Sequence, residues 1–190
     1  MRLAPVRTAA PSLEPVTLAE VKTHLRVDHT DEDDYIAALI SAAIEQLEGH
    51  VGILGGRALV NQSWRQDFGG FAADLRLSLS PLVSVTSVTY YDADNAQQTL
   101  AASVYQAFDD ALGPYLATAP GESWPSAYGR VDAVSVTFVA GYGATAASVP
   151  APIRAAIMLA VGNWYDERGG ALDMPPAAIA LVRPYRRRGV

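Results

Sequence analysis

The sequence contains no cysteine, which excludes a disulfide framework and a thiolate metal site. Lysine occurs only as Lys22, and histidine is scarce, so few side chains are available for acid–base chemistry. No run approaches the roughly 20 consecutive apolar residues that span a bilayer, and the N-terminal residues lack the apolar centre of a signal peptide. We therefore predict a protein that is made in the cytoplasm and has no membrane partner.

Motifs typical of catalysis are also missing. There is no Gly-x-Ser-x-Gly nucleophile elbow and no Gly-x-x-x-x-Gly-Lys phosphate loop, and His50 falls at the glycine-rich end of a predicted helix. The nearest approach to a metal site is a set of residues that straddles a turn, with a spacing that does not converge on one point: His24, Asp28, His29 and Asp31. We predict no catalytic residue, no metal site and no cofactor, and hence no enzyme.

The charge of the chain is unevenly distributed. Residues 1–150 hold 17 acidic and 8 basic residues, a net charge of −9, whereas residues 151–190 hold 3 acidic and 6 basic residues, a net charge of +3. Binding to nucleic acid depends on basic side chains that neutralise phosphates. The acidic body is therefore expected to repel nucleic acid, and only the C-terminal tail is expected to seek a negatively charged partner.

Two helices are predicted in the first third of the chain. Thr17 and Glu20 have the spacing of a capping box, which starts a helix over residues 18–25. A second helix is predicted over residues 31–51, with Val51 on its apolar face. It begins with four acidic residues, where the helix dipole favours negative charge. These residues are Asp31, Glu32, Asp33 and Asp34.

The rest of the chain reads as strands followed by helices. Alternating and β-branched residues over 57–140 predict an antiparallel sheet. A third helix is predicted over 151–167, with Trp164 in the core, and a short helix follows Pro175 and Pro176. The fold class is therefore α+β, a helical bundle with an antiparallel β-sheet inserted between the second and third helices.

This pattern divides the chain into three parts. Residues 1–16 are predicted to form a flexible N-terminal arm, residues 17–170 a single domain, and residues 171–190 a short helix with a basic tail. The tail holds four arginines around a tyrosine. Arginine forms bidentate pairs with carboxylates, and tyrosine is a rigid apolar anchor at interfaces. The tail therefore suits an acidic groove on a partner, although a solvated chain end is an equally simple reading.

Two segments resemble a known family. Residues 17–64 read TLAEVKTHLRVDHTDEDDYIAALISAAIEQLEGHVGILGGRALVNQSW, and residues 149–169 read VPAPIRAAIMLAVGNWYDERG. Both are similar to segments of the head–tail connector (adaptor) proteins found in tailed bacteriophages, prophages and gene transfer agents. These are packing and capping motifs, so they indicate a fold family and identify no chemistry.

The resemblance implies a structural protein of a virion or phage-like particle. Connectors of this family form a ring, usually of twelve subunits, between the portal protein and the head-closure or tail proteins, and DNA passes through the ring without being read. On this chain, the resemblance implies a mobile C-terminal segment, from about Pro175 to Val190, that docks on the portal. The portal-binding residues would be Arg183, Tyr185, Arg186, Arg187 and Arg188. A subunit interface or channel lining would be formed by Asp31, Glu32, Asp33 and Asp34.

Three alternatives stay open at this point. Within the same structural class, the chain also suits a head-closure or tail-completion protein. In a different class, the aromatic residues of the predicted sheet, among them Trp64 and Trp124, suit a soluble module that binds carbohydrate or another ligand. A small hydrolase is disfavoured because no nucleophile is apparent.

Overall fold

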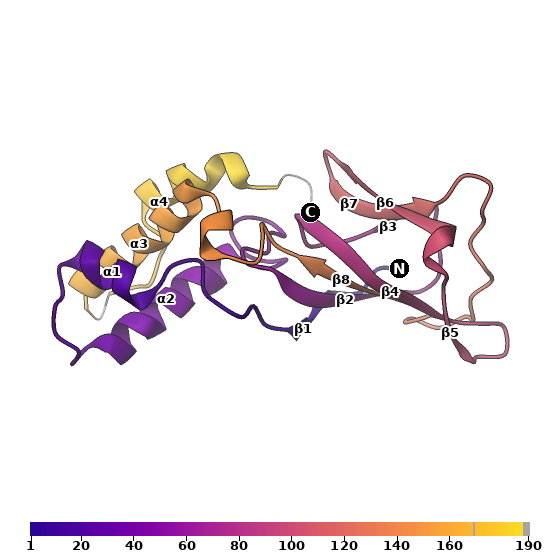
Figure 1. Cartoon of the computed structure of the whole chain (residues 1–190), viewed down its shortest axis with the longest axis horizontal. Helices are drawn as coiled ribbons and strands as arrows, with labels where there is room; N and C mark the ends of the chain where they lie inside the picture. The colour runs from indigo at the N-terminus through magenta and orange to yellow at the C-terminus, as the bar shows by residue number, and fades with distance from the viewer. Residues whose placement is uncertain (169, 188–190) are drawn as a thin grey trace.

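The computed structural model describes residues 1–168 and 170–187, and shows an elongated molecule with helices at one end and strands at the other (Figure 1). The helices are α1 (Leu18–Leu25), α2 (Asp33–Leu47), α3 (Ala151–Asp166) and α4 (Pro176–Val182). The strands are β1 (Val6–Ala9), β2 (Gln62–Phe68), β3 (Leu75–Arg76), β4 (Leu82–Tyr91), β5 (Gln97–Thr99), β6 (Tyr105–Asp110), β7 (Gly113–Thr118) and β8 (Val134–Ala140). The α+β class is confirmed.

The capping box at the start of α1 is present. The Thr17 hydroxyl accepts a hydrogen bond from the Glu20 backbone N–H at 3.2 Å, and the Glu20 carboxylate accepts one from the Thr17 N–H at 2.8 Å. Helix α1 ends where Arg26 adopts a left-handed conformation with φ of 62°. Both bounds agree with the sequence pattern, because capping is decided by residues three positions apart.

Helix α2 is shorter than the predicted span of 31–51. It starts at Asp33 and ends at Leu47, where Glu48 turns the backbone to an extended conformation and Gly49 takes a φ of +84°. The prediction that Val51 lies on its apolar face was wrong, because Val51 lies in the following turn and is 85% exposed. Glycine takes a positive φ without steric cost, so the helix ends at the first glycine of this region.

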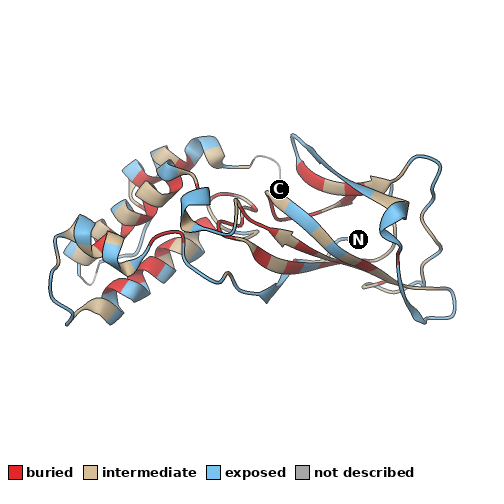
Figure 2. Cartoon of the chain, in the orientation of Figure 1, coloured by how far each residue is buried: buried red, intermediate tan, exposed pale blue. Residues whose placement is uncertain are grey.

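The helices enclose one apolar core. Val21, Ile40, Ile157 and Val182, from four different helices, are all almost completely buried, and Trp164 lies among them as predicted. Burial is confined to one face of each helix, as the red stripes in Figure 2 show. The segments that supply this core are far apart in sequence, so the helical end forms only when both ends of the chain meet.

The strands form two antiparallel sheets. The larger has the order β1-β2-β8-β4-β5 and the smaller the order β3-β7-β6. Strands β2 to β8 lie between α2 and α3 in the chain, but β1 precedes α1 and pairs with β2, with Arg7 opposite Trp64. The prediction of one inserted sheet was therefore incomplete, because strand pairing with a distant segment leaves no local pattern.

A second core lies between the two sheets. Leu75, Leu77 and Leu116 belong to the smaller sheet and its flanking chain and pack against Phe138 of β8, and all four are fully buried. Gln66 joins the two layers, because its amide oxygen accepts a hydrogen bond from the Ser78 N–H at 2.8 Å. The molecule therefore has two cores side by side, one helical and one between sheets.

The N-terminal segment, which was expected to be a flexible arm over residues 1–16, packs on the body in the structure. Strand β1 lies in the large sheet, Val16 is fully buried, and Arg154 of α3 donates a hydrogen bond to the Pro15 carbonyl at 2.9 Å. Backbone pairing and burial hold this segment, which its proline content alone did not reveal. Among the described residues, no helix combines the length and the apolar character that crossing a membrane requires.

Candidate functional site

The acidic run lies at the junction of α1, α2 and α3. Glu32 is the residue before α2, and its carboxylate accepts hydrogen bonds from the Tyr165 hydroxyl and the Arg168 guanidinium, near the end of α3. The Arg168 guanidinium also lies 5.4 Å from the ring centre of Tyr35, which makes a cation–π contact. The hydrogen bonds from Tyr165 and Arg168 hold the pKa of Glu32 below its usual range.

The other three acids of the run differ in their surroundings. Asp33 accepts a hydrogen bond from the Lys22 ammonium at 2.5 Å, and this ion pair joins α2 to α1. Asp31 and Asp34 are exposed. Within the run, Glu32 and Asp33 therefore stabilise the packing of the helices, whereas Asp31 and Asp34 are available to a partner.

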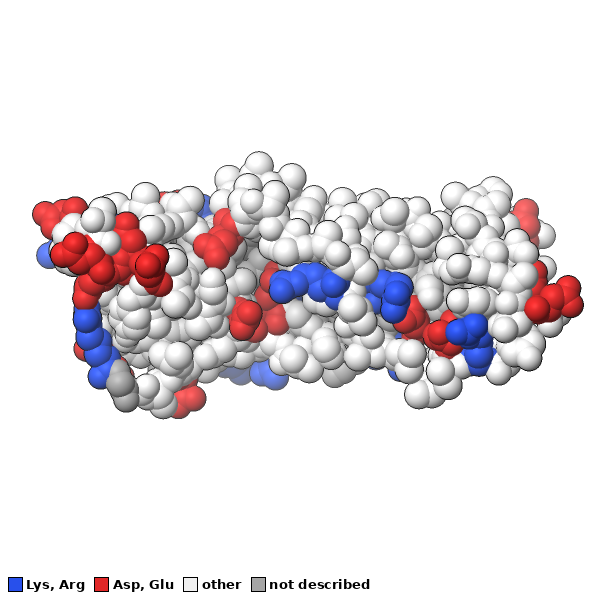
Figure 3. Space-filling view, turned by 90° about the horizontal axis from the view of Figure 1, so that it is seen from below, with Lys and Arg blue, Asp and Glu red and all other residues white. Residues whose placement is uncertain are grey.

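Acidic side chains gather at the helical end of the molecule in the view of Figure 3, while basic side chains run along the middle of this face. Arg7 and Arg65 lie on the neighbouring strands β1 and β2, and their side chains are about half exposed. Both arginines have an acidic neighbour within the chain, Glu48 at 3.9 Å from Arg7 and Asp67 at 3.2 Å from Arg65, so the charge of this face is uneven but not cleanly divided. Such a surface is suited to an asymmetric contact with a second molecule.

The histidines and acids of the α1–α2 turn do not form a metal site. Lys22 donates a hydrogen bond to the His29 carbonyl at 2.6 Å, which ties the turn to α1. Within residues 1–168 and 170–187, no group of three or more His, Asp and Glu side chains is arranged to hold a metal ion. In the described structure the residues of this turn serve to connect α1 to α2.

The C-terminal segment crosses from the helical end to the sheets. Ala178 and Val182 of α4 are buried against the helical core, and Gln46 of α2 donates a hydrogen bond to the Leu172 carbonyl at 2.6 Å. A short 3-10 helix, Arg183–Tyr185, continues α4. The described part of the segment expected to be mobile is therefore packed on the body, because it carries apolar residues that complete the core.

The predicted portal-binding residues that the structure describes are either exposed or partly buried. Arg183 and Arg186 are exposed. Tyr185 is half-buried against the helical core, and its carbonyl accepts a hydrogen bond from Arg57 at 3.2 Å. Arg188 lies outside the described residues.

Arg187 is inserted between the glycine-rich loop that follows α2 and the β6–β7 turn. Its guanidinium donates hydrogen bonds to the carbonyl oxygens of Leu112 at 2.8 Å, Ser78 at 3.0 Å and Leu77 at 3.3 Å, and its backbone N–H donates one to Leu54 at 3.0 Å. Burial lowers the pKa of Arg187. The residue therefore anchors the tail to both cores.

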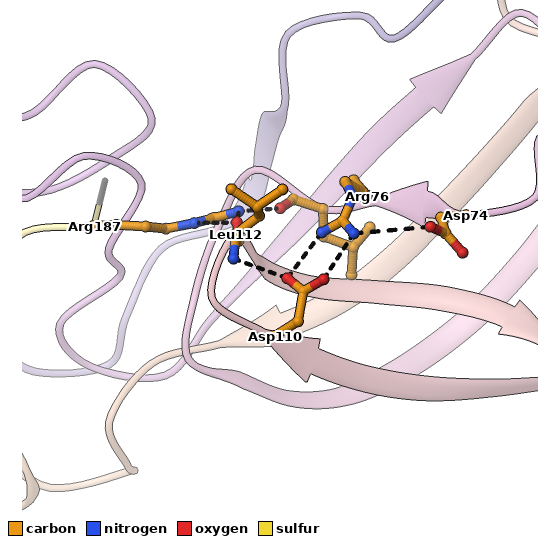
Figure 4. A network of polar contacts seen from close by, with 6 residues as sticks. Asp74, Arg76, Asp110, Leu112 and Arg187 are labelled. Atoms are coloured by element: carbon orange, nitrogen blue, oxygen red, sulfur yellow. Dashed lines mark hydrogen bonds and ion pairs between the residues drawn. The ribbon is translucent and has the colours of Figure 1, made fainter. Parts of the chain in front are cut away.

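A polar network holds the β6–β7 turn, whose Leu112 carbonyl accepts from Arg187, as Figure 4 shows. Asp110 accepts a hydrogen bond from the Leu112 N–H at 2.8 Å and two from Arg76, at 3.0 and 2.7 Å. Arg76 also lies 3.8 Å from Asp74. The hydrogen bonds from Arg76 lower the pKa of Asp110 to about 2, so its carboxylate is ionised in ordinary buffers and keeps the turn in place.

The seat of Arg187 was not predicted from the sequence. It is built from Gly55, Gly56 and Gly113, which come from two distant loops. A Cβ at Gly113 would lie 2.3 Å from the guanidinium carbon of Arg187, and one at Gly55 would lie 2.9 Å from its carbonyl oxygen. The signal in the sequence is the unusual number of glycines after α2, which by itself indicates only the end of a helix.

Comparison with known proteins assigns the chain to a family. The model of the phage gp6-like head-tail connector protein matches residues 15–110, which include α1, the acidic run, α2 and β2 to β6. The chain belongs to this head-tail connector family. The connector is therefore a structural protein of the head–tail junction of a phage-like particle, and not an enzyme.

Solved structures resemble the connector over its whole length. A chain of the virion of a native gene transfer agent particle is 26% identical, covers 99% of this chain and 97% of its own, and superposes with a TM-score of 0.79. A chain from the neck of an empty gene transfer agent particle computed with C6 symmetry is 25% identical, with a TM-score of 0.78 and the same coverage.

A third chain, from the neck of a native gene transfer agent particle computed with C12 symmetry, is 23% identical and shares the fold with a TM-score of 0.72. No curated protein matches the connector by sequence. The resemblance includes α4 and the C-terminal segment, because the aligned part covers nearly all of both chains.

Proposed function

We propose that this connector is one subunit of a ring, with twelve copies, that lies in the neck of a phage-like particle between the portal protein and the head-closure or tail proteins. The match to a chain of a gene transfer agent virion over 99% of this chain carries the proposal. The necks that contain similar chains were computed with C6 and C12 symmetry, which supports a ring of this order.

The charge distribution supports contact between unlike faces of neighbouring subunits. A ring closes by head-to-tail contacts, in which one surface of a subunit meets a different surface of the next. The acidic helical end is one such surface, and the half-exposed Arg7 and Arg65 of β1 and β2 belong to another. Asp31 and Asp34 are the exposed acids of the helical end that are proposed to contact a neighbour or to line the channel.

An acidic channel lining would let DNA pass without binding it. Phosphates bind where basic side chains displace their counterions, and acidic side chains offer no such exchange. Replacing both Asp31 and Asp34 with Asn should leave the fold unchanged, because both are exposed. Normal particle assembly and normal DNA ejection with this double variant would count against a role for these residues in the interface or channel.

The portal contact is assigned to the C-terminal segment. Arg183 and Arg186 are exposed and present two guanidinium groups, which pair well with carboxylates. Tyr185 and Arg187 hold the segment on the body in the free subunit. The proposed contact therefore begins at Arg183 and Arg186, with Tyr185, Arg187 and Arg188 completing it.

A binding experiment with the portal protein of the same particle tests this function. The full chain should sediment with the portal and form rings visible by electron microscopy. An Arg183→Gln, Arg186→Gln double variant, and a chain that ends at Val182, should lose portal binding. Equal binding by all three proteins would refute the assignment of the contact to this segment, and the absence of any ring or portal complex would refute the proposed role.

A further inference from the structure

Arg187 is a charged residue held by neutral groups. Within the described part of the chain, each hydrogen bond from its guanidinium goes to a backbone carbonyl, at Leu77, Ser78 or Leu112. The nearby Asp110 is already engaged by Arg76 and by the Leu112 N–H. Arginine pairs more strongly with a carboxylate than with a neutral carbonyl, so this seat satisfies the guanidinium without offering its strongest partner.

The site that holds Arg187 is open on one side, which gives the side chain a path to leave it. Gly55, Gly56 and Gly113 contact Arg187. The site adjoins a pocket of about 510 Å³ that is lined in part by Arg57, Asp109 and Arg186. Two hydrogen bonds hold the backbone of residues 185–187 on the body: the Arg187 N–H donates to the Leu54 carbonyl, and Arg57 donates to the Tyr185 carbonyl. For residues 185–187 to lift from the surface, these two hydrogen bonds, the guanidinium bonds of Arg187 and the apolar contact of Tyr185 must break.

We propose that Arg187 and its seat, formed by Gly55, Gly56, Gly113 and the carbonyls of Leu77, Ser78 and Leu112, are a latch that holds the C-terminal segment closed on the free subunit and opens when a carboxylate-bearing partner surface takes the arginine. This inference rests on the proposed contact between the C-terminal segment and the portal. It adds a closed state of the segment and the chemical class of group that opens it.

The latch explains how one segment serves two states. In the free subunit the exposed Arg183 and Arg186 are available for the first contact, while Arg187 is partly buried and its guanidinium is hydrogen-bonded within the chain. A partner that offers carboxylates beside them competes with neutral carbonyls for Arg187. Release of Arg187 therefore requires a negatively charged partner. In an isolated subunit the C-terminal segment stays packed on the body.

Amide hydrogen exchange of the free subunit tests the closed state. The Arg187→Gln variant removes the guanidinium and leaves the seat intact, so the amides of Arg186 and the residue at 187 should exchange about tenfold faster, as for a locally opened segment. Arg183→Gln is the matched control, because Arg183 is exposed. In this variant the amides of residues 186 and 187 should exchange at the wild-type rate. Equal exchange in the wild type and in Arg187→Gln would overturn the latch.

A second variant changes the seat and leaves Arg187 unsubstituted. In Gly113→Ala the new Cβ would lie 2.3 Å from the guanidinium carbon, so Arg187 is displaced although it is still present, and the φ of +104° at this position adds backbone strain. Faster exchange at Arg187, with far-UV circular dichroism like that of the wild type, is the expected result. A folded Gly113→Ala protein with unchanged exchange would refute the seat as the restraint, and the Arg187→Gln result stands if the alanine variant fails to fold.

Spin labels test the opening step, since a chain without cysteine accepts labels only where cysteine is introduced. Labels at Ala111→Cys and Pro184→Cys lie at exposed positions outside the seat. Their separation should be short and narrowly distributed in the free subunit and should lengthen on binding the portal. An unchanged separation in a portal complex would overturn the release. Failure of the portal to bind at all would instead refute the proposed function, while the exchange results would still decide the closed state.

Discussion

The helical end and the sheet end of this connector are stabilised in different ways. The helical core is built from apolar side chains of four helices, and the described buried polar residues all lie outside these helices. They are confined to the region from the end of α2 to the start of β4: Glu48, Gln62, Gln66, Asp67, Ser78 and Ser80. The sheet end and its junction with the helices therefore depend on specific hydrogen bonds, and the helical end on the fit of apolar faces.

This contrast bears on how the two ends contribute to assembly. Because the helical core depends on apolar faces, the outer surface of the helical end can carry charge, as the exposed Asp31 and Asp34 show. The hydrogen bonds of the junction fix the position of the loops that contact Arg187. For example, the Ser80 N–H donates a hydrogen bond to the Gly56 carbonyl at 2.8 Å. One end therefore supplies the charged surface, and the other supplies the seat for the tail.

The largest effect is expected from emptying the helical core. Trp164→Ala removes a side chain that is 2% exposed and its hydrogen bond to the Asp173 carbonyl, and should lower the free energy of unfolding by about 3–5 kcal/mol. Urea denaturation measures this loss. Leu159→Ala, on the exposed side of the same helix, should cost roughly 0.5 kcal/mol. Similar losses for the two variants would contradict the contrast between the two faces of α3.

A smaller effect is expected from breaking one polar link between the sheets. Gln66→Ala leaves the buried Ser78 N–H without its acceptor and should lower the free energy of unfolding by about 1–3 kcal/mol. The exposed Gln98, which donates to Asp92, gives a matched control, and Gln98→Ala should cost roughly 0.5 kcal/mol or less. If Gln66→Ala and Gln98→Ala unfolded at the same urea concentration, the hydrogen bond between Gln66 and Ser78 would not stabilise the core between the sheets.

The junction should give stability a distinctive pH dependence. Burial raises the pKa of Glu48 above its ordinary value of 4.5, so the folded protein binds more protons than the unfolded chain just above that pH. The free energy of unfolding therefore falls as pH rises from 4.5 through the raised pKa. Glu48→Gln keeps an acceptor for the Leu59 N–H and should lose this fall. Parallel urea midpoints for the two proteins between pH 4.5 and 8 would contradict the prediction.

The smallest effect is expected at the surface of the helical end. Glu32→Gln weakens the contacts with Arg168 and Tyr165 and should lower the melting temperature slightly, more at low salt than at high salt, because surface ion pairs are screened. Thermal unfolding at two salt concentrations measures this. A loss independent of salt would indicate that the contact acts through packing and not through charge.

The sequence predicted the helical end better than the sheet end. The capping box at Thr17, the burial of Trp164 and the class of the protein followed from residues close together in the chain. The N-terminal strand and the second sheet did not, because Arg7 meets Trp64, and Leu75 meets Leu116, across long intervals of sequence. Such pairings leave no periodic signal to distinguish a strand in a sheet from an extended arm.

The candidate site was also predicted in part. The acidic run and the basic tail were found from composition, but which acids pair within the chain depended on Lys22, Arg168 and Tyr165, which belong to other helices. By itself, the sequence determined the helices and their caps, the uneven charge and the resemblance to connectors, because these depend on near neighbours. Only the tertiary structure decided that Arg187 lies in a seat of carbonyls and glycines, because Gly55 and Gly113 meet around it only when the two cores are packed side by side.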